Sequence, residues 1–182
     1  MKAGDTITPL LLTEANLLPG DILLYVGNVF KSKIALFIQK SENDIENHAA
    51  IYTGKTKAVF ESLLHGPQFN TIENSIKEAK NVYVLRTYPE IPLPTEAQIL
   101  KVIEDEKFDD MRYGFFDILA QKIYIQTGVY LGSTKNKHGI ICSVLVTKIR
   151  NILNNLLFPK YWLWNPSMIS KYAKLRVVGF LK

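Results

Sequence analysis

Short apolar segments bounded by turn residues fill the first half of the chain and restrict it to a fold that contains a β-sheet. Four such segments lie at 22–26, 48–53, 58–61 and 82–86. Runs of this length between turn residues are typical of buried strands. Because Gly54 and Lys55 separate the second segment from the third, we expect residues 48–61 to form a hairpin. Residues 69–72 are a candidate edge strand.

The second half of the chain favours helices. Thr95 and Gln98 have the spacing of a capping box, which predicts a helix over 95–107. The strongest amphipathic pattern begins at Cys142 and ends before Pro159. Its apolar residues share one helical face: Leu145, Ile149, Ile152, Leu153 and Leu156. Further elements are predicted as helices at 29–40, 73–80 and 113–127, and as a last strand at 175–181. We therefore predict an α+β fold, a small antiparallel sheet packed with helices.

The length and composition fit one domain. The chain has 182 residues, of which 47% are hydrophobic, enough to bury one core. We expect a single domain over 1–182, with residues 1–17 as an N-terminal leader. No apolar run is long enough to span a bilayer. Asp5, Pro9 and Glu14 interrupt the first twenty residues, so no secretory signal is predicted and a cytoplasmic location is the default expectation.

The basic excess of the chain says little about partners. The net charge is +5, and it is diffuse apart from Lys135, Lys137 and the C-terminal lysines. A solvated basic face is the simplest interpretation, and peripheral contact with an anionic surface is the alternative. No nucleic-acid-binding motif accompanies the charge, so nucleic acid is not an expected partner. The oligomeric state is not predicted.

Cys142, the one cysteine of the chain, is a candidate nucleophile. It follows a glycine-flanked loop and opens the amphipathic helix, so the positive end of the helix dipole should face its sulfur. A helix N-terminus favours the thiolate, which is the reactive form. The alternative is an inert buried cysteine that packs as a small hydrophobic residue.

His48 and Glu61 are candidate partners for this cysteine. Each lies on one strand of the predicted hairpin, and pairing would bring both to the same end of it. The Glu61 carboxylate could then hold the His48 imidazole in the correct tautomer, which is the third role of a catalytic triad. Taken alone, His48 could equally be a surface histidine and Glu61 a solvated strand end.

Five short motifs resemble those of the permuted papain-like amidases, the circularly permuted relatives of NlpC-type cell-wall peptidases. They are LPGDILL at 18–24, HAAIYTG at 48–54, VFES at 59–62, YGFFD at 113–117 and CSVLV at 142–146. The order, with the histidine-bearing sheet before the cysteine helix, is that of the permuted enzymes. A more distant similarity extends to the lecithin retinol acyltransferase group. The resemblance spans about residues 18–170.

The resemblance implies a circularly permuted papain-like fold and a role for each site residue. Cys142 would be the nucleophile, His48 the general base and Glu61 the orienting group. The predicted substrate-binding residues are Tyr113 near the cleft, Asp21 at the turn into the first strand, Ser143 and His65. No metal or organic cofactor is expected. Many relatives carry an acidic residue where this chain has Val144, which affects contacts at the helix start.

Three functions remain open at this point. The first is a cysteine hydrolase that cleaves an amide, such as a cell-wall peptide, or an ester through a thioacyl intermediate. The second is a lipid acyl hydrolase or acyltransferase built on the same site. The third is a binding module that retains the fold without catalysis, whose cysteine would show the alkylation profile of an ordinary thiol. His138 is a weaker candidate base, because it lies in a lysine-rich loop.

Overall fold

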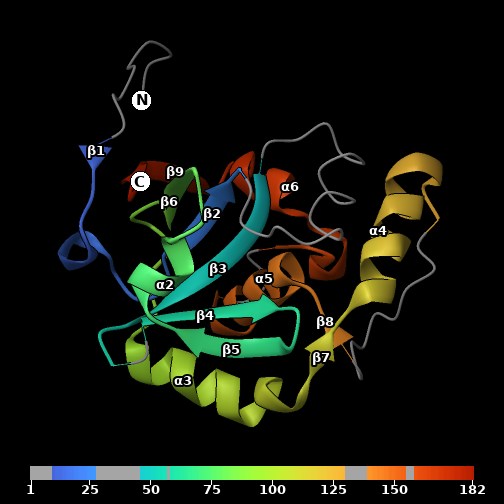
Figure 1. Ribbon diagram of the computed structural model, residues 1–182, viewed down its shortest axis with the longest axis horizontal. Coiled ribbons are helices and arrows are strands. Elements are labelled where there is room, and N and C mark those ends of the chain that lie inside the picture. The colour runs from blue at the N-terminus through green and yellow to red at the C-terminus, as the bar shows by residue number, and fades with distance from the viewer. Residues whose placement is uncertain (1–9, 28–45, 57, 130–138, 155–157) are drawn as a thin grey trace.

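Seven strands form one continuous sheet through the middle of the protein (Figure 1). The computed structural model describes residues 10–27, 46–56, 58–129, 139–154 and 158–182. In spatial order the strands are β1 (Leu10–Leu11), β9 (Leu175–Phe180), β6 (Asn81–Thr87), β2 (Ile22–Val26), β3 (Glu46–Gly54), β4 (Ala58–Leu63) and β5 (Gly66–Asn70). All neighbouring pairs are antiparallel except β1 and β9, which run parallel.

Helices and a second, two-stranded sheet complete the described part of the chain. The helices are α2 (Ile72–Ile76), α3 (Glu96–Asp105), α4 (Phe115–Thr127), α5 (Cys142–Asn154) and α6 (Pro166–Ser170). Helix α5 packs behind β3 and β4, α2 lies on the opposite face, and α4 stands at the edge of the molecule (Figure 1). Strands β7 (Arg112–Tyr113) and β8 (Gly139–Ile140) pair in parallel and lead into α4 and α5. Among the described residues, no helix is both long and apolar enough to span a bilayer.

Both faces of the sheet are buried, which explains why its central strands read as continuous apolar runs. Leu24 and Ile51 face the helix side, where they join a cluster with Leu145 of α5. Leu23 and Tyr52 face the other side and pack in a second cluster. Successive side chains of a strand point to opposite faces, so the inner strands β2, β3, β4 and β6 contribute to both clusters.

The predicted α+β fold class is confirmed, and most elements lie within a few residues of their expected positions. The hairpin over 48–61 is present as β3 and β4, and the capping box of Thr95 and Gln98 begins α3. The helix predicted over 29–40 lies outside the described residues. The sheet is larger than predicted, because residues assigned to a leader take part in it: Leu10–Leu11 form β1, and Leu12 is buried in the core.

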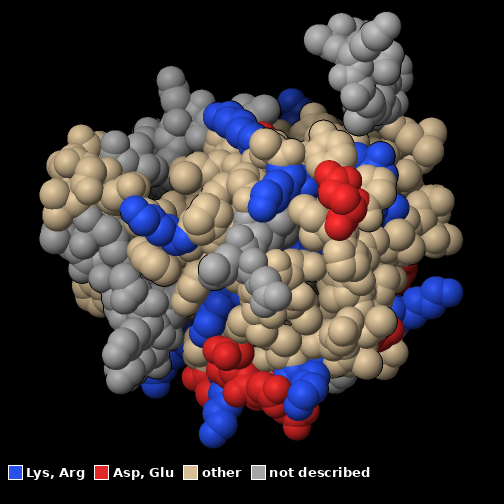
Figure 2. Space-filling view, turned by 180° about the vertical axis from the view of Figure 1, so that it is seen from behind, with Lys and Arg blue, Asp and Glu red and all other residues tan. Residues whose placement is uncertain are grey.

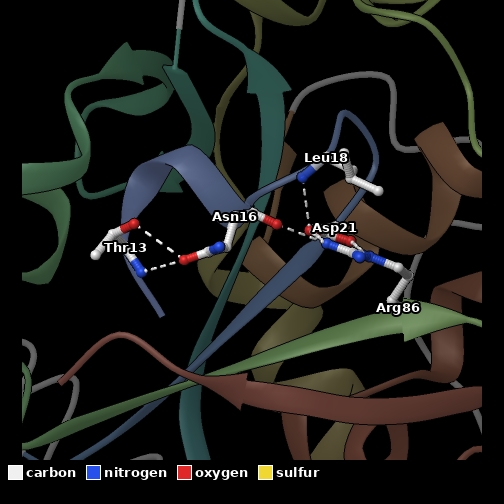
Figure 3. Close-up of polar contacts among 5 residues, drawn as sticks. All are labelled: Thr13, Asn16, Leu18, Asp21 and Arg86. Atoms are coloured by element: carbon white, nitrogen blue, oxygen red, sulfur yellow. Dashed lines mark hydrogen bonds and ion pairs between the residues drawn. The ribbon is translucent and has the colours of Figure 1, made fainter. Parts of the chain in front are cut away.

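A partly buried ion pair joins Asp21, directly before β2, to Arg86 of β6. The Arg86 guanidinium donates to both carboxylate oxygens of Asp21, from Nε at 2.7 Å and from an Nη at 2.6 Å (Figure 3). Asp21 also accepts the amide of Leu18 at 2.8 Å, and Arg86 donates to the carbonyl of Asn16 at 3.0 Å. The pair therefore fastens the N-terminal segment to the sheet.

Charged side chains are dispersed over the visible surface. Figure 2 shows lysines and arginines scattered among uncharged residues on the face opposite to that of Figure 1, with acidic groups between them. No single continuous basic patch is visible among the described residues on this face. The distribution agrees with a diffuse basic excess.

Candidate active site

Cys142 is the first residue of α5 and is 5% exposed. The first helical hydrogen bond runs from the amide of Leu145 to the carbonyl of Ile141. The amides of the first turn therefore precede the hydrogen-bonded part of the helix and carry the positive end of its dipole. The Ser62 hydroxyl donates to the carbonyl of Ile140 at 2.7 Å and so ties β4 to the segment that leads into Cys142.

Strand register brings His48 and Glu61 together. Ala50 of β3 lies opposite Glu61 of β4, and His48 is two residues from Ala50 on the same face. His48 and Glu61 are thus diagonal neighbours, a separation that long side chains can bridge. The His48 Nε2 atom lies 2.8 Å from Glu61 Oε2, and both residues are buried. The Tyr25 ring packs on the His48 ring with the centroids 4.9 Å apart.

His48 also forms a side-chain hydrogen bond with Cys142. Since Nε2 faces Glu61, Nδ1 is the ring nitrogen left for the sulfur. Burial by itself lowers the pKa of His48, but the electrostatic interaction and hydrogen bond with Cys142 and the contact with Glu61 outweigh burial and raise this pKa to about 10. The favoured state of His48 is therefore the imidazolium.

Glu61 is held in its ionised form by several donors. Burial raises the pKa of this carboxyl, but hydrogen bonds from His48, Asn70 and Ser75 outweigh burial, and the pKa is lowered. The Asn70 amide donates to Glu61 Oε1 at 3.1 Å. Ser75 of α2 also contacts the Tyr25 hydroxyl, with 2.5 Å between the two oxygens. A buried chain of contacts therefore runs from Cys142 through His48 to Glu61 and on to α2.

A small cavity of about 20 Å³ adjoins Cys142, with room for about one water molecule. It is lined by Asn47, Tyr113, Ile118, Gln121, Ile141, Cys142, Ser143, Asn165 and Pro166. The pKa of Tyr113 is raised by burial and by the negative charge of Cys142, which places the phenol beside the sulfur. The Gln121 amide donates to the carbonyls of Trp162 and Trp164 and so fixes this wall of the cavity.

The structure brings five of the seven predicted site residues together. Cys142, His48 and Glu61 form one connected set, and the substrate-binding candidates Tyr113 and Ser143 line the cavity. The remaining two predicted residues, Asp21 and His65, do not line this cavity.

Asp21 and His65 lie outside the cavity. Tyr25 pairs with His48, so Asp21, before the first residue of β2, lies toward the opposite end of that strand. There it pairs with Arg86 and accepts the Leu18 amide, in agreement with its expected role at the turn into the first strand, and it does not line the Cys142 cavity. His65 is exposed in the turn between β4 and β5. The alternative base His138 lies outside the described residues.

Sequence reasoning missed the residues that support the triad. Asn70 could have been found from its place on β5, because it lies opposite Val59 and hence diagonal to Glu61. Ser75 and Tyr25 approach from another helix and strand, and no sequence spacing reports their contacts. Asn47 precedes His48, but no sequence pattern indicates that it belongs to the site.

Replacing Ser75 by alanine should shift the pH dependence of any activity at this site. Loss of a donor to the ionised carboxylate raises the pKa of Glu61, so the acid limb of a kcat/KM profile should move to higher pH. On that acid limb, Ser75→Ala should lower kcat/KM by about tenfold, the usual effect of losing one charge-assisted hydrogen bond. Asn74→Ala, on the exposed side of the same helix, is the matched control and should leave the limb in place. An unshifted limb in Ser75→Ala would show that Ser75 does not act through Glu61.

No model of a known protein family matches this sequence, and a search of curated proteins finds no match. The chemistry of the site is therefore inferred from its own residues.

Proposed function

We propose that this protein is a cysteine hydrolase that cleaves an amide bond through a Cys142–His48–Glu61 triad. The observation that carries the proposal is the buried chain in which His48 contacts Cys142 on one side and lies 2.8 Å from Glu61 on the other. A nucleophile, a base within hydrogen-bonding reach and a third group that orients the base are the geometric signature of covalent catalysis.

The proposed reaction is acyl transfer through a thioester. The Cys142 sulfur attacks the carbonyl carbon, and amides at the start of α5 stabilise the oxyanion. His48 gives its proton to the leaving nitrogen, the C–N bond breaks, and an amine departs. A water molecule, deprotonated by His48, then attacks the thioester, which releases a carboxylic acid and restores the thiol. Glu61 orients the His48 ring throughout and stabilises the imidazolium whenever it forms.

A circularly permuted papain-like fold is part of this proposal. Its support is the chain order, in which strands β3 and β4 supply the base and the orienting acid before α5 supplies the nucleophile. Helix α5 packs against both strands, so its first residue reaches the end of β3 that carries His48. The packing explains why residues far apart in the sequence form one site.

Trapping the acyl-enzyme tests the proposal. Wild-type protein mixed with an activated acyl donor, such as a p-nitrophenyl ester, should gain the mass of one acyl group on Cys142, measured by intact-protein and peptide mass spectrometry. The Cys142→Ala variant should gain none. Acylation elsewhere, or none on the folded wild type, would contradict the hydrolase and favour a binding module that retains only the fold.

A second candidate is a lipid acyl hydrolase, and α4 is the feature that favours it. Ile118 and Gln121 of this helix line the Cys142 cavity, whereas Phe116 is 88% exposed and Leu119 48% exposed. Exposed apolar side chains beside a site suit an approach to a membrane surface. Turnover of phospholipid vesicles, compared with peptidoglycan-derived peptides, separates the two candidates.

A further inference from the structure

Two residues that line the cavity beside Cys142 each carry a buried side-chain atom without a hydrogen-bond partner in the described structure. The two atoms are Oδ1 of Asn47, whose residue is 4% exposed, and Oγ of Ser143, whose residue is fully buried. Buried polar atoms in native proteins are nearly always paired, so an unpaired one needs an explanation. Here both residues line the same small cavity as the candidate nucleophile, which suggests that a ligand group pairs with the two atoms.

The orientation of the Asn47 amide is set by its other end. Its Nδ2 donates to the carbonyl oxygen of Gly27, which can only accept. Oδ1 therefore points away from that contact and presents an acceptor. A ligand group that pairs with Asn47 must carry a donor, such as an N–H.

Ser143 supplies the complementary function. It follows Cys142 in the first turn of α5, and its hydroxyl can donate a hydrogen bond. Together with the first amides of the helix it forms a set of donors that suits a carbonyl oxygen. The residues that line the cavity thus include donors, an acceptor and the sulfur.

We infer that Asn47 selects secondary amides over esters, by accepting the N–H of the bond that Cys142 attacks while Ser143 donates to its carbonyl oxygen. This inference rests on the proposed function and names its substrate class. An amide has both a carbonyl and an N–H, whereas an ester has only the carbonyl.

The expected discrimination follows from the cost of an unpaired buried acceptor. With an ester bound, Asn47 Oδ1 stays buried and unpaired, as it is without substrate; with an amide it is paired. One such hydrogen bond is worth about 10- to 100-fold in kcat/KM. Removing the acceptor should therefore lower amide turnover by about that factor and leave ester turnover nearly unchanged.

The test uses matched pairs of p-nitroanilides and p-nitrophenyl esters of the same acyl groups, N-acetyl-alanyl and octanoyl. Asn47→Ala should reduce the amide-to-ester ratio of kcat/KM about 10- to 100-fold. Ser143→Ala should lower both substrates by similar factors, because both contain a carbonyl. Asn154→Ala is the matched control: its Nδ2 also donates to a backbone carbonyl and its Oδ1 is also unpaired, but it lies at the far end of α5.

The outcomes separate this inference from the proposed function. An unchanged ratio in Asn47→Ala, with both substrates turned over, would overturn the role of Asn47 and leave the hydrolase standing. Turnover that survives in Cys142→Ala, or no turnover of any pair by the wild type, would overturn both. Should Asn47→Ala fail to fold, the wild type is compared on the anilide and its N-methyl derivative, which lacks the N–H; equal rates would contradict the inference.

Discussion

Replacement of Cys142 by alanine is expected to lower kcat/KM for an amide substrate by at least about 10⁴-fold. The physical reason is that Cys142 supplies the thiol in contact with His48, and alanine has no nucleophilic group. The free energy of unfolding should change far less than activity, because the cysteine side chain is small and α5 remains anchored by Leu145 and Ile149. Hydrolysis assays and urea unfolding measure the two effects separately.

The pH profile provides an independent check on the same site. The pKa of His48 is raised to about 10 by Cys142 and Glu61, so the imidazolium form persists to alkaline pH. Activity that needs this proton for the leaving group should therefore decline only as the pH rises through about 10. A decline near the ordinary histidine value of about 6.5 would show that Cys142 and Glu61 do not stabilise the imidazolium of His48.

Cys142→Ser is the conservative control. It replaces the thiol at the helix start by a hydroxyl of similar size and should fold like the wild type, but a serine in this position is a far weaker nucleophile at neutral pH. Substantial hydrolysis by either variant would remove Cys142 from the mechanism.

Asp21→Asn is expected to lower the free energy of unfolding by about 3–5 kcal/mol, the usual cost of leaving a buried charge without its partner. Asp21 is fully buried and pairs with Arg86 (Figure 3). It also attracts Arg150, which is fully buried on α5 and has no hydrogen bond from its guanidinium in the described structure. Burial lowers the pKa of Arg150 to about 10, with the attraction of Asp21 opposing the shift. Neutralising Asp21 leaves both arginines uncompensated.

Two further variants test whether the loss of the Asp21 charge causes the destabilisation. Asp105→Asn makes the same chemical change in an exposed pair with Lys101 and should cost less than about 1 kcal/mol. Arg150→Met in the Asp21→Asn background removes the fully buried cation and should recover part of the lost stability. Chemical denaturation at fixed pH measures all three. Equal effects of Asp21→Asn and Asp105→Asn would contradict the role assigned to the buried pair.

Local sequence signals predicted the elements of the fold because those signals act over a few residues. Neighbouring residues alone indicate a strand or a helix in the apolar runs of β2 and β3, the capping box at Thr95 and the amphipathic face of α5. Strand β1 was missed because it has two residues and is defined by its partner β9, which is more than 160 residues away in the chain.

The residues of the candidate site also fall into those that local sequence signals predict and those that depend on tertiary contacts. Cys142, His48 and Glu61 could be predicted because a helix start and a hairpin are local features, and a hairpin places residues of its two strands side by side. Asp21 lies at the expected turn before β2, but a turn sequence next to an acidic residue does not say which end of the sheet faces the helix start. That assignment depends on the register of β2 with β3, which pairs Tyr25 with His48.

The sequence by itself determined the α+β class, the hairpin and the identity of the candidate triad, since these follow from periodicity, turn residues and one cysteine at a helix start. Only the tertiary structure decided how the triad is supported. Ser75 and Tyr25 reach Glu61 and His48 from separate elements, and Asn47 and Ser143 face a common cavity only because α5 docks on β3. Such contacts arise from packing between segments distant in the chain, and short-range sequence patterns contain no information about them.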